Sequence, residues 1–526
     1  MTTDVLLATI DTLTRVVEQR DEALNIAQLT IDKLKIELSY LKRMQYGRSS
    51  EKLDHDGQLE LMESGMAPAP AANDAAASTV APIERGRNKR TLSPRVGLRE
   101  LPAHLPRETI VHNPVGGCNC TACGARLREI GQDVSEVLEY EPGKFHVIRH
   151  VRPKLACGGC QSITQAPAPS RPIERGLAGA GLMTHVLVSK YADHTPLYRQ
   201  SQIYARDGVE LAPSTLTDLV GSAAWLLTPL AQAVGRYVLG GYKVHGDDTP
   251  IRVLGGAKNK AKTGRLWVYV RDDRASADTA PPAVWFQYSA NRKGEHPQRH
   301  LRGYHGILQA DAFAGYNSLF NDGSVIEAAC WAHARRKYFE VHKQQELLPG
   351  TLAHQALQRI AKIYAVESDI RGENAELRRS QRHLRTRPIL EEMHEWLQAV
   401  LGQISAKSPM AQAIGYSLSN WRALVRFLDD GRIEADNNIA ERALRSVAIG
   451  RKNYLHFGSD GGGQTAAVIY TLIGTAKLCG INPQAYLRYV LERIADHPIN
   501  RIDELLPWAV AKHLGRGVVE PMPLAA

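Results

Sequence analysis

The sequence predicts a multidomain α+β protein in which helical segments flank a mixed α/β core. Three observations lead to this prediction. Apolar residues recur with heptad spacing near the N-terminus, five of the seven cysteines cluster between Cys118 and Cys160, and five strand-like runs fall between residues 242 and 331. A chain of 526 residues is long enough for roughly three to four domains, each with its own core.

Composition and charge restrict the class of protein. Hydrophobic residues make up 44% and charged residues 23% of the chain, as in ordinary globular proteins. The formal net charge of +10 favours an acidic partner such as nucleic acid, although any single basic run also fits a solvated helix face. The sequence has neither a signal-peptide pattern nor an apolar run of about 20 residues. We therefore expect a cytoplasmic protein with no membrane partner and with reduced cysteines.

Residues 1–50 are expected to form a coiled-coil helix. Apolar side chains alternate at spacings of four and three from Leu6 to Leu41, which predicts a homo-oligomer held by paired helices. The alternative is a single helix lying against its own globular body. Residues 51–100 contain the stretch "SGMAPAPAANDAAASTVAP" and a basic run, so we interpret them as a linker.

Residues 101–168 combine strand-like alternation with two Cys-x-x-Cys turns. Four thiolates in such turns can surround one structural Zn²⁺ tetrahedrally. The predicted ligands are Cys120, Cys123, Cys157 and Cys160, with Cys118 as an alternative first ligand. Reduced, unliganded cysteines or a redox pair would give the same pattern. Cys330 and Cys479 are isolated among apolar neighbours and are interpreted as core residues.

Residues 169–236 change to a helical pattern. A short helix, a turn at Gly208 and a second helix from Ser214 outline a helix-turn-helix. We therefore expect this segment to bind DNA, although a generic three-helix bundle gives the same pattern.

Residues 237–331 carry the five strand-like runs. They fall at 242–247, 264–271, 283–289, 306–311 and 324–331, with short helical stretches before and after the fourth. Three strands, helix, strand, helix, strand is the element order of an RNase H-like α/β core. Residues 332–430 are almost wholly helical and would form an insertion. Residues 431–475 hold the helix that closes the core, and residues 476–526 form a C-terminal helical segment.

Acidic residues stand at the ends of two predicted strands. Asp247 and Asp248 end the first strand, in "HGDDTP", and Asp311 ends the fourth. Neighbouring strand ends share one rim of a sheet, so these carboxylates can meet in space. Carboxylates bind Mg²⁺ or Mn²⁺, and two such ions can assist phosphodiester displacement. A third acid is expected on a later helix, from Glu434, Asp436 or Glu441.

The paired acids of "HGDDTP" also have an ordinary interpretation. Asp248 with Thr249 and Pro250 fits the turn that leaves the strand. Alternation along the strand points the side chains of Asp247 and Asp248 to opposite faces, so only one of them should reach the metals. We expect Asp247 to be the direct ligand and Asp248 to shape the turn.

The other acids have ordinary interpretations as well. Asp311 fits a helix cap, Asn438 with Glu441 fits a capping box, and Glu441 with Arg445 fits an i,i+4 ion pair. Taken singly, each of these structural interpretations explains its acid as well as a catalytic role does. The joint placement on two strands and a late helix favours a metal site.

Long motifs run along nearly the whole chain. They include "LKRMQYGRSSEKL" (41–53), the two cysteine pairs, "SKYADHTPLYRQSQIYARDGVELAPSTLTDLVG" (189–221), "HGDDTPIRVL", "LQADAFAGYN", "CWAHARRKYFE", "ADNNIAERALR" and "GTAKLCGINPQAYL". On these motifs the chain resembles the insertion-sequence-66 family of bacterial DDE transposases.

This resemblance implies a transposase with an RNase H-like core interrupted by a helical insertion. The family pattern places the catalytic, metal-binding acids at Asp247, Asp311 and Glu441, with two Mg²⁺ or Mn²⁺ ions. Such enzymes hydrolyse DNA at the ends of their element and transfer the freed 3′-hydroxyl into target DNA. The implied partners are the terminal inverted repeats and target DNA, in the bacterial nucleoid. Participation of other proteins from the same element stays open.

One departure from the pattern concerns the third acid. Many DDE enzymes carry a basic residue seven positions after the glutamate, where this chain has Ala448, so Asp436 remains the rival of Glu441. The predicted phosphate-binding residues are Arg335, Arg336, Arg442 and Arg445, and His333 is a candidate to orient a phosphate or a water. Two other functions fit the chain: a DNA-binding regulator without activity, and a nuclease that cuts without joining.

Overall fold

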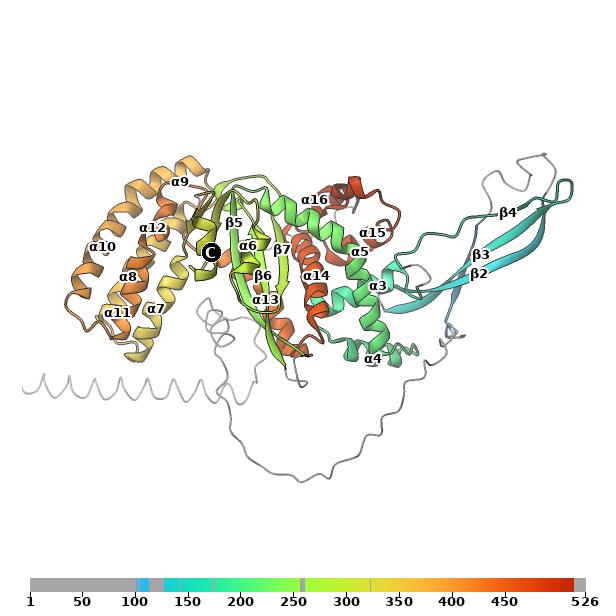
Figure 1. Ribbon diagram of the computed structural model, residues 1–526, viewed down its shortest axis with the longest axis horizontal. Coiled ribbons are helices and arrows are strands. Elements are labelled where there is room, and N and C mark those ends of the chain that lie inside the picture. The colour runs from blue at the N-terminus through green and yellow to red at the C-terminus, as the bar shows by residue number, and fades with distance from the viewer. Residues whose placement is uncertain are drawn as a thin grey trace, which may run out of the picture. The chain divides into compact units, whose positions relative to one another are not determined.

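The computed structural model describes residues 101–514, apart from residues 102, 104, 113–126, 142, 174–175, 256–260 and 322. These residues belong to one unit of the chain, Thr91–Ala526 (Figure 1). The predicted coiled coil, the predicted linker and Cys118, Cys120 and Cys123 lie outside the described residues.

The first sheet is built on a long antiparallel hairpin. Strand β2 (Leu127–Glu141) pairs with β3 (Lys144–Cys157), and Gly143 makes the connecting turn with a φ of 82°. Strand β1 (Arg107–Val111) pairs in parallel with β3, and β4 (Ile163–Gln165) pairs antiparallel with it. The predicted strands are therefore present, and β2 and β3 stay paired over their full lengths across one irregularity.

Three helices follow this sheet. They are α3 (Ala180–Tyr191), α4 (Leu197–Arg206) and α5 (Pro213–Leu239). Gly208 takes a φ of 79° in the turn between α4 and α5, a conformation that favours glycine. The 27-residue α5 packs against β7 and α14, so the helical segment shares one hydrophobic core with the second sheet.

The second sheet has the strand order β7-β6-β5-β8-β9. Its strands are β5 (Lys243–Val253), β6 (Lys262–Arg271), β7 (Ala283–Ser289), β8 (Gly306–Gln309) and β9 (Val325–Ala328). Strands β5, β6 and β7 are antiparallel neighbours, whereas β8 and β9 run parallel to β5. Helix α6 (Glu295–His300) precedes β8, and a 3₁₀ helix, η3 (Ala314–Phe320), follows it. All five predicted strands and both short helical stretches are present.

The end of β5 was predicted wrongly. The strand does not end at Asp247 and Asp248 but continues to Val253, and Thr249 and Pro250 are paired with β6 rather than forming a turn. Pairing with β8 stops at His245, so β5 pairs with β6 alone beyond that residue until an isolated bridge joins Val253 to Phe457. A proline is tolerated there because its missing N–H faces the unpaired side of the strand.

The predicted insertion is helical throughout and has its own core. Its elements are α7 (Trp331–Gln344), α8 (Leu352–Asp369), α9 (Ala375–Gln381), the π-helix η4 (Arg382–Thr386), α10 (Arg387–Leu401), α11 (Pro409–Ser419), α12 (Trp421–Leu424) and η5 (Arg426–Leu428). Trp331, Tyr338 and Ile360 are among its buried residues, and Ile307 and Ala328 of the sheet belong to the same cluster. The insertion is thereby anchored on the β8–β9 edge.

The chain then returns to the sheet. The closing elements are α13 (Asn438–Tyr454), α14 (Asp460–Leu478), α15 (Pro483–Leu491), η6 (Ile499–Leu505), α16 (Pro507–Val510) and η7 (Ala511–His513). Helix α14 protects the edge strand β7, since Thr471 and Thr475 accept hydrogen bonds from the N–H groups of Phe286 and Val284 at 2.9 and 3.2 Å.

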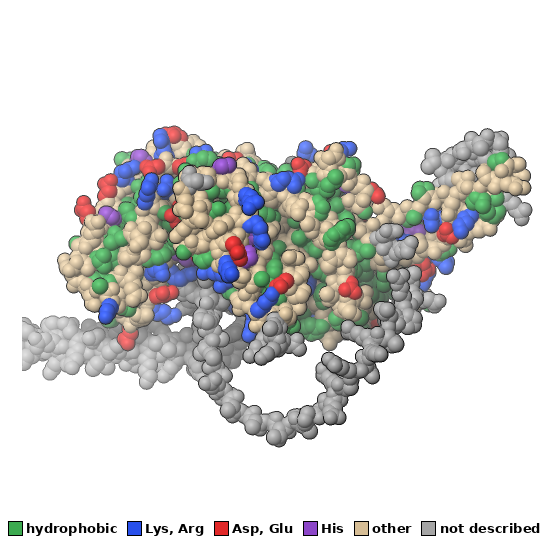
Figure 2. Space-filling view, in the orientation of Figure 1, with side chains coloured by type: hydrophobic (Ala, Val, Ile, Leu, Met, Phe, Trp, Pro, Cys, Tyr) green, Lys and Arg blue, Asp and Glu red, His purple; other side chains and the backbone are tan. Residues whose placement is uncertain are grey.

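Figure 2 shows basic side chains gathered between the insertion helices and the sheet on one face.

The packing of α5 on β7 leads to a matched pair of glycine predictions. A Cβ at Gly235 would lie 2.7 Å from the Trp285 ring, whereas a Cβ at Gly221 of the same helix would meet nothing within 4 Å. We expect Gly221→Ala to stabilise the protein by up to about 1 kcal/mol through helix propensity, and Gly235→Ala to destabilise it by about 1–3 kcal/mol through overpacking. Denaturant unfolding measures both, and equal effects at the two sites would contradict the described packing.

Candidate active site

Strand pairing brings the first two predicted acids to one place. His245 of β5 pairs with Gln309 of β8, so Asp247 and Asp311 each lie two residues beyond the last pair of a parallel ladder. The carboxylate of Asp247 accepts a hydrogen bond from the Asp248 N–H at 2.7 Å. Burial raises the pKa of Asp247 well above its usual value, and the nearby charges of Asp311 and Glu441 raise that pKa further.

Asp311 combines a capping role with a place at this cluster. Its Oδ1 accepts a hydrogen bond from the Phe313 N–H at 3.1 Å ahead of η3, as the ordinary interpretation predicted. Its Oδ2 lies 3.5 Å from the guanidinium of Arg292. Burial raises the pKa of Asp311, while the positive charges of Arg292 and Arg336 oppose that rise.

Glu441 lies in the first turn of α13, and its side chain is 9% exposed. The start of this helix is held to β5 by Asn437. The Asn437 side chain donates to the Gly246 carbonyl at 2.9 Å and lies 3.0 Å from Nδ1 of His245. The predicted capping box is wrong, because Asn438 instead donates to Asp436 from both its backbone and its side chain.

The imidazole of His333 lies beside Glu441, with Nδ1 of His333 3.6 Å from Oε1 of Glu441. Burial lowers the pKa of His333, so the ring is neutral at physiological pH. Among the described residues no ion pair between Glu441 and Arg445 is found at this helix. His333 therefore lies beside the third predicted acid, within reach of the cluster.

Asp248 has a structural partnership instead of a turn. Its side chain is only 2% exposed and binds Arg265 and Arg292, each at 2.9 Å. Arg292 therefore bridges Asp248 and Asp311 and compensates part of the negative charge at the cluster. The sequence interpretation missed both arginines, since nothing in the local sequence links Asp248 to Arg265 on the neighbouring strand β6 or to Arg292 beyond β7.

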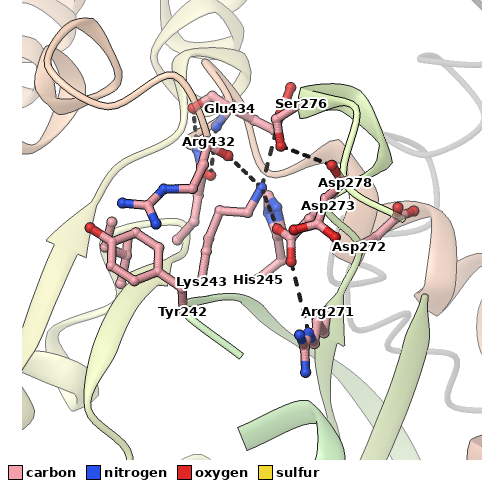
Figure 3. Close-up of polar contacts among 12 residues, drawn as sticks. Tyr242, Lys243, His245, Arg271, Asp272, Asp273, Ser276, Asp278, Arg432 and Glu434 are labelled. Carbon is pink, nitrogen blue, oxygen red and sulfur yellow. Dashed lines mark hydrogen bonds and ion pairs between the residues drawn. The ribbon is translucent and has the colours of Figure 1, made fainter. Parts of the chain in front are cut away.

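Two acids that competed for the third position are engaged elsewhere. Glu434 makes a two-pronged ion pair with Arg378, at 3.0 and 3.1 Å. Although burial opposes it, the charge of the buried Lys243 beside Glu434 helps to lower the pKa of Glu434 to about 2 (Figure 3). Asp436 accepts its two hydrogen bonds from Asn438 at 3.0 and 2.9 Å. The charge of Glu441 is among the main causes of the raised pKa of Asp247.

The predicted phosphate-binding arginines fall into two groups. Arg335 and Arg336 lie in the first turns of α7, where the charge of Arg336 acts on Asp311. Arg442 and Arg445 are exposed on α13. Arg451, further along α13, donates to Thr249 and to the Pro250 carbonyl at 2.9 and 2.7 Å and so links this helix to β5.

Comparison with known proteins identifies the family. A family model described as "Transposase IS66 family" matches residues 175–465, more than half of the chain. The chain belongs to this family of transposases. Two similar proteins come from Sinorhizobium fredii (strain NBRC 101917 / NGR234). "Uncharacterized protein y4hP" is 39% identical over 90% of this chain and 88% of its own length, and "Uncharacterized protein y4jD" is 37% identical over 92% and 95%.

Three further family models match other parts of this transposase. They describe the IS66 C-terminal element (471–508), a zinc-finger binding domain of transposase IS66 (118–161) and a "Transposase C of IS166 homeodomain" region (33–110). The matches indicate a DNA-processing protein that uses zinc and a divalent metal. The homeodomain-like match also indicates DNA binding in a region that the sequence interpretation treated as coiled coil and linker.

The described half of the zinc module has the local geometry of a metal-binding turn. Cys157 ends β3 and is buried, Cys160 is exposed, and the Cys160 N–H points at Sγ of Cys157 at 3.5 Å.

In the described part of the transposase, no helix is both long and apolar enough to cross a membrane.

The raised pKa of Asp247 has a consequence for stability. A carboxyl whose pKa is raised by folding binds more protons in the folded state, so it destabilises the protein increasingly as the pH rises above about 4, the unfolded value. We expect Asp247→Asn to raise the melting temperature in magnesium-free buffer by about 2–4 °C near pH 8, corresponding to about 1 kcal/mol.

The same substitution should have a smaller effect near pH 5, because the destabilisation by a carboxyl with a raised pKa grows with pH above the unfolded value and has accumulated less there. Asp496→Asn, at an exposed position, serves as the control and should leave the melting temperature unchanged at both pH values. A pH-independent effect of Asp247→Asn, or destabilisation by it, would contradict the burial of this charge.

Proposed function

We propose that this transposase cuts DNA at the ends of its insertion sequence and joins the freed 3′-hydroxyl to target DNA. The observations that carry the proposal are that Asp247 and Asp311 each lie two residues beyond the last pair of the β5–β8 ladder, and that the charges of Asp311 and Glu441 help to raise the pKa of Asp247. The strand order β7-β6-β5-β8-β9, with three antiparallel and two parallel strands, supports an RNase H-like core.

The three carboxylates fit a pair of Mg²⁺ or Mn²⁺ ions. Carboxylate oxygens are the ligands that these hard cations prefer. Burial raises the pKa values of Asp247 and Asp311, so cations that replace protons at these two carboxylates would stabilise their charged forms. When bound, two such ions supply activation of the attacking oxygen and stabilisation of the leaving oxygen.

The protein's own side chains have separate roles in this proposal. Arg292 holds Asp311 and Asp248 in place and limits the negative charge at the cluster. Arg442 and Arg445, exposed on the helix that carries Glu441, and Arg335 and Arg336 on α7 bind backbone phosphates and fix the position of the DNA strand.

We further propose roles for the segments that flank the core. Cys120, Cys123, Cys157 and Cys160 hold one structural Zn²⁺, residues 169–236 and the homeodomain-like region contribute to recognition of the element's ends, and residues 1–50 pair two copies of the chain.

The three acids can be tested by isosteric substitution. We expect Asp247→Asn, Asp311→Asn and Glu441→Gln to reduce nicking and joining of labelled element ends by about 10³-fold or more, since each removes a ligand worth several kcal/mol of transition-state stabilisation. Asp436→Asn is the matched control, because its carboxylate is satisfied by Asn438, and it should retain activity within about threefold.

Band-shift measurement of end binding with the same variants separates chemistry from folding. Binding should be retained in all four variants. A wild-type protein that binds ends without nicking them would favour a regulator, and nicking without joined product would favour a nuclease. Full activity in Glu441→Gln with loss in Asp436→Asn would move the third acid to Asp436.

A further inference from the structure

A second group of potential metal ligands lies beside the acids. The Sγ of Cys330, a ring nitrogen of His333 and a carboxylate oxygen of Glu441 all lie within 4.8 Å of one another. Cys330 directly precedes α7, His333 lies in the first turn of that helix, and Glu441 lies in the first turn of α13. The sequence carries a signal for this group that was missed, because "CWAH" places a cysteine and a histidine at the spacing of a metal-binding turn.

Two of the three ligand atoms are buried without a protein partner. Nδ1 of His333 and Oε1 of Glu441 accept or donate no hydrogen bond within the described residues, and their separation of 3.6 Å is too long for one between them. A buried polar atom without a partner costs about 1–3 kcal/mol. Two such atoms facing each other are what a shared cation would satisfy.

The Cys330 sulfur has hydrogen-bond donors around it, as metal-bound thiolates commonly do. Cys330 is fully buried, and its Sγ accepts a hydrogen bond from the Asn437 N–H at 3.1 Å and another from the His333 N–H. Backbone N–H groups aimed at a sulfur orient it and stabilise its charged form at metal sites. The contact from residue i+3 to the cysteine is also present between Cys160 and Cys157 in the zinc-finger region of the same chain.

We propose that Cys330, His333 and Glu441 form a second site for a Zn²⁺-like ion, separate from the four-cysteine module. One sulfur, one nitrogen and one oxygen are the ligand types that zinc prefers, and three protein ligands leave a fourth tetrahedral position for water. Magnesium, which takes oxygen ligands in octahedral geometry, is not expected to use the cysteine.

This site would regulate the reaction through the ligand that it shares. Glu441 is the third catalytic acid, a role that rests on the proposed function. A zinc ion held by Cys330 and His333 draws the Glu441 carboxylate toward α7 and away from the ions held by Asp247 and Asp311. Zinc is therefore an inhibitor that competes with Mg²⁺ for Glu441.

Zinc stoichiometry of the full-length protein tests the binding claim directly. In titrations against a chromogenic chelator, the wild type should bind two equivalents of Zn²⁺ per chain. Cys330→Ser and His333→Gln should each bind one equivalent tightly. Their affinity for the second equivalent should fall at least about 100-fold, since losing a metal ligand costs no less than losing a residue that orients one.

Two cysteine variants act as matched controls. Cys479→Ser removes another core thiol, whose Sγ contacts the Pro282 carbonyl, and should still bind two equivalents. Cys157→Ser should lose the module's zinc but keep the equivalent at Cys330. With the module loaded with zinc, added Co²⁺ should give a thiolate-to-cobalt absorption band that Cys330→Ser lacks.

The outcomes separate this proposal from the proposed function. Equal stoichiometry in the wild type, Cys330→Ser and His333→Gln, with circular dichroism showing all three folded, would overturn the site whether or not the protein cuts DNA. Asp247→Asn should abolish cutting yet bind two equivalents. If the site is correct, zinc should inhibit nicking by the wild type, and increasing Mg²⁺ should relieve that inhibition. Zinc should inhibit Cys330→Ser less than the wild type, when each is compared with its own activity without zinc.

Discussion

The geometry of the whole site depends on how the chain returns from the insertion to the sheet. Asp311 and Glu441 are separated by 130 positions, so local structure alone cannot bring them together. Asn437 solves this problem with three contacts: its side chain bonds Gly246 and His245 on β5, and its N–H bonds Cys330 at the start of α7. One asparagine thereby fixes the first turn of α13 against the strand that carries the first acid.

A buried ionic network reinforces this return. Lys243, at the start of β5, contacts Asp273 and Glu434 at 3.4 and 3.9 Å (Figure 3). Glu434 in turn forms an ion pair with Arg378 of the insertion. Arg378 then contacts Glu367 at 3.5 Å. Removing one partner from such a network typically costs about 3–5 kcal/mol, because it leaves a buried charge unpaired. The network therefore stabilises one placement of the insertion relative to the sheet, and with it one placement of α13.

The sequence predicted the elements better than their ends or their side-chain partners. Five strands and the helical insertion follow from apolar runs and helical periodicity, which are local signals. The extension of β5 through Pro250 was not predictable in this way, since it depends on which neighbour stops pairing and where. The same holds for Arg292, whose role follows from a bridge between Asp248 and Asp311 that only the folded sheet creates.

Glu441 lies between two proposed metal sites with different ligand types. On one side lie the carboxylates of Asp247 and Asp311, which favour a hard cation, and on the other lie a thiol and an imidazole, which favour a softer one. The carboxylate can serve both sets only in turn, because its position on α13 is fixed at the first turn by Asn437. A site that shares one ligand between two cations of different preference responds to their ratio rather than to either concentration alone.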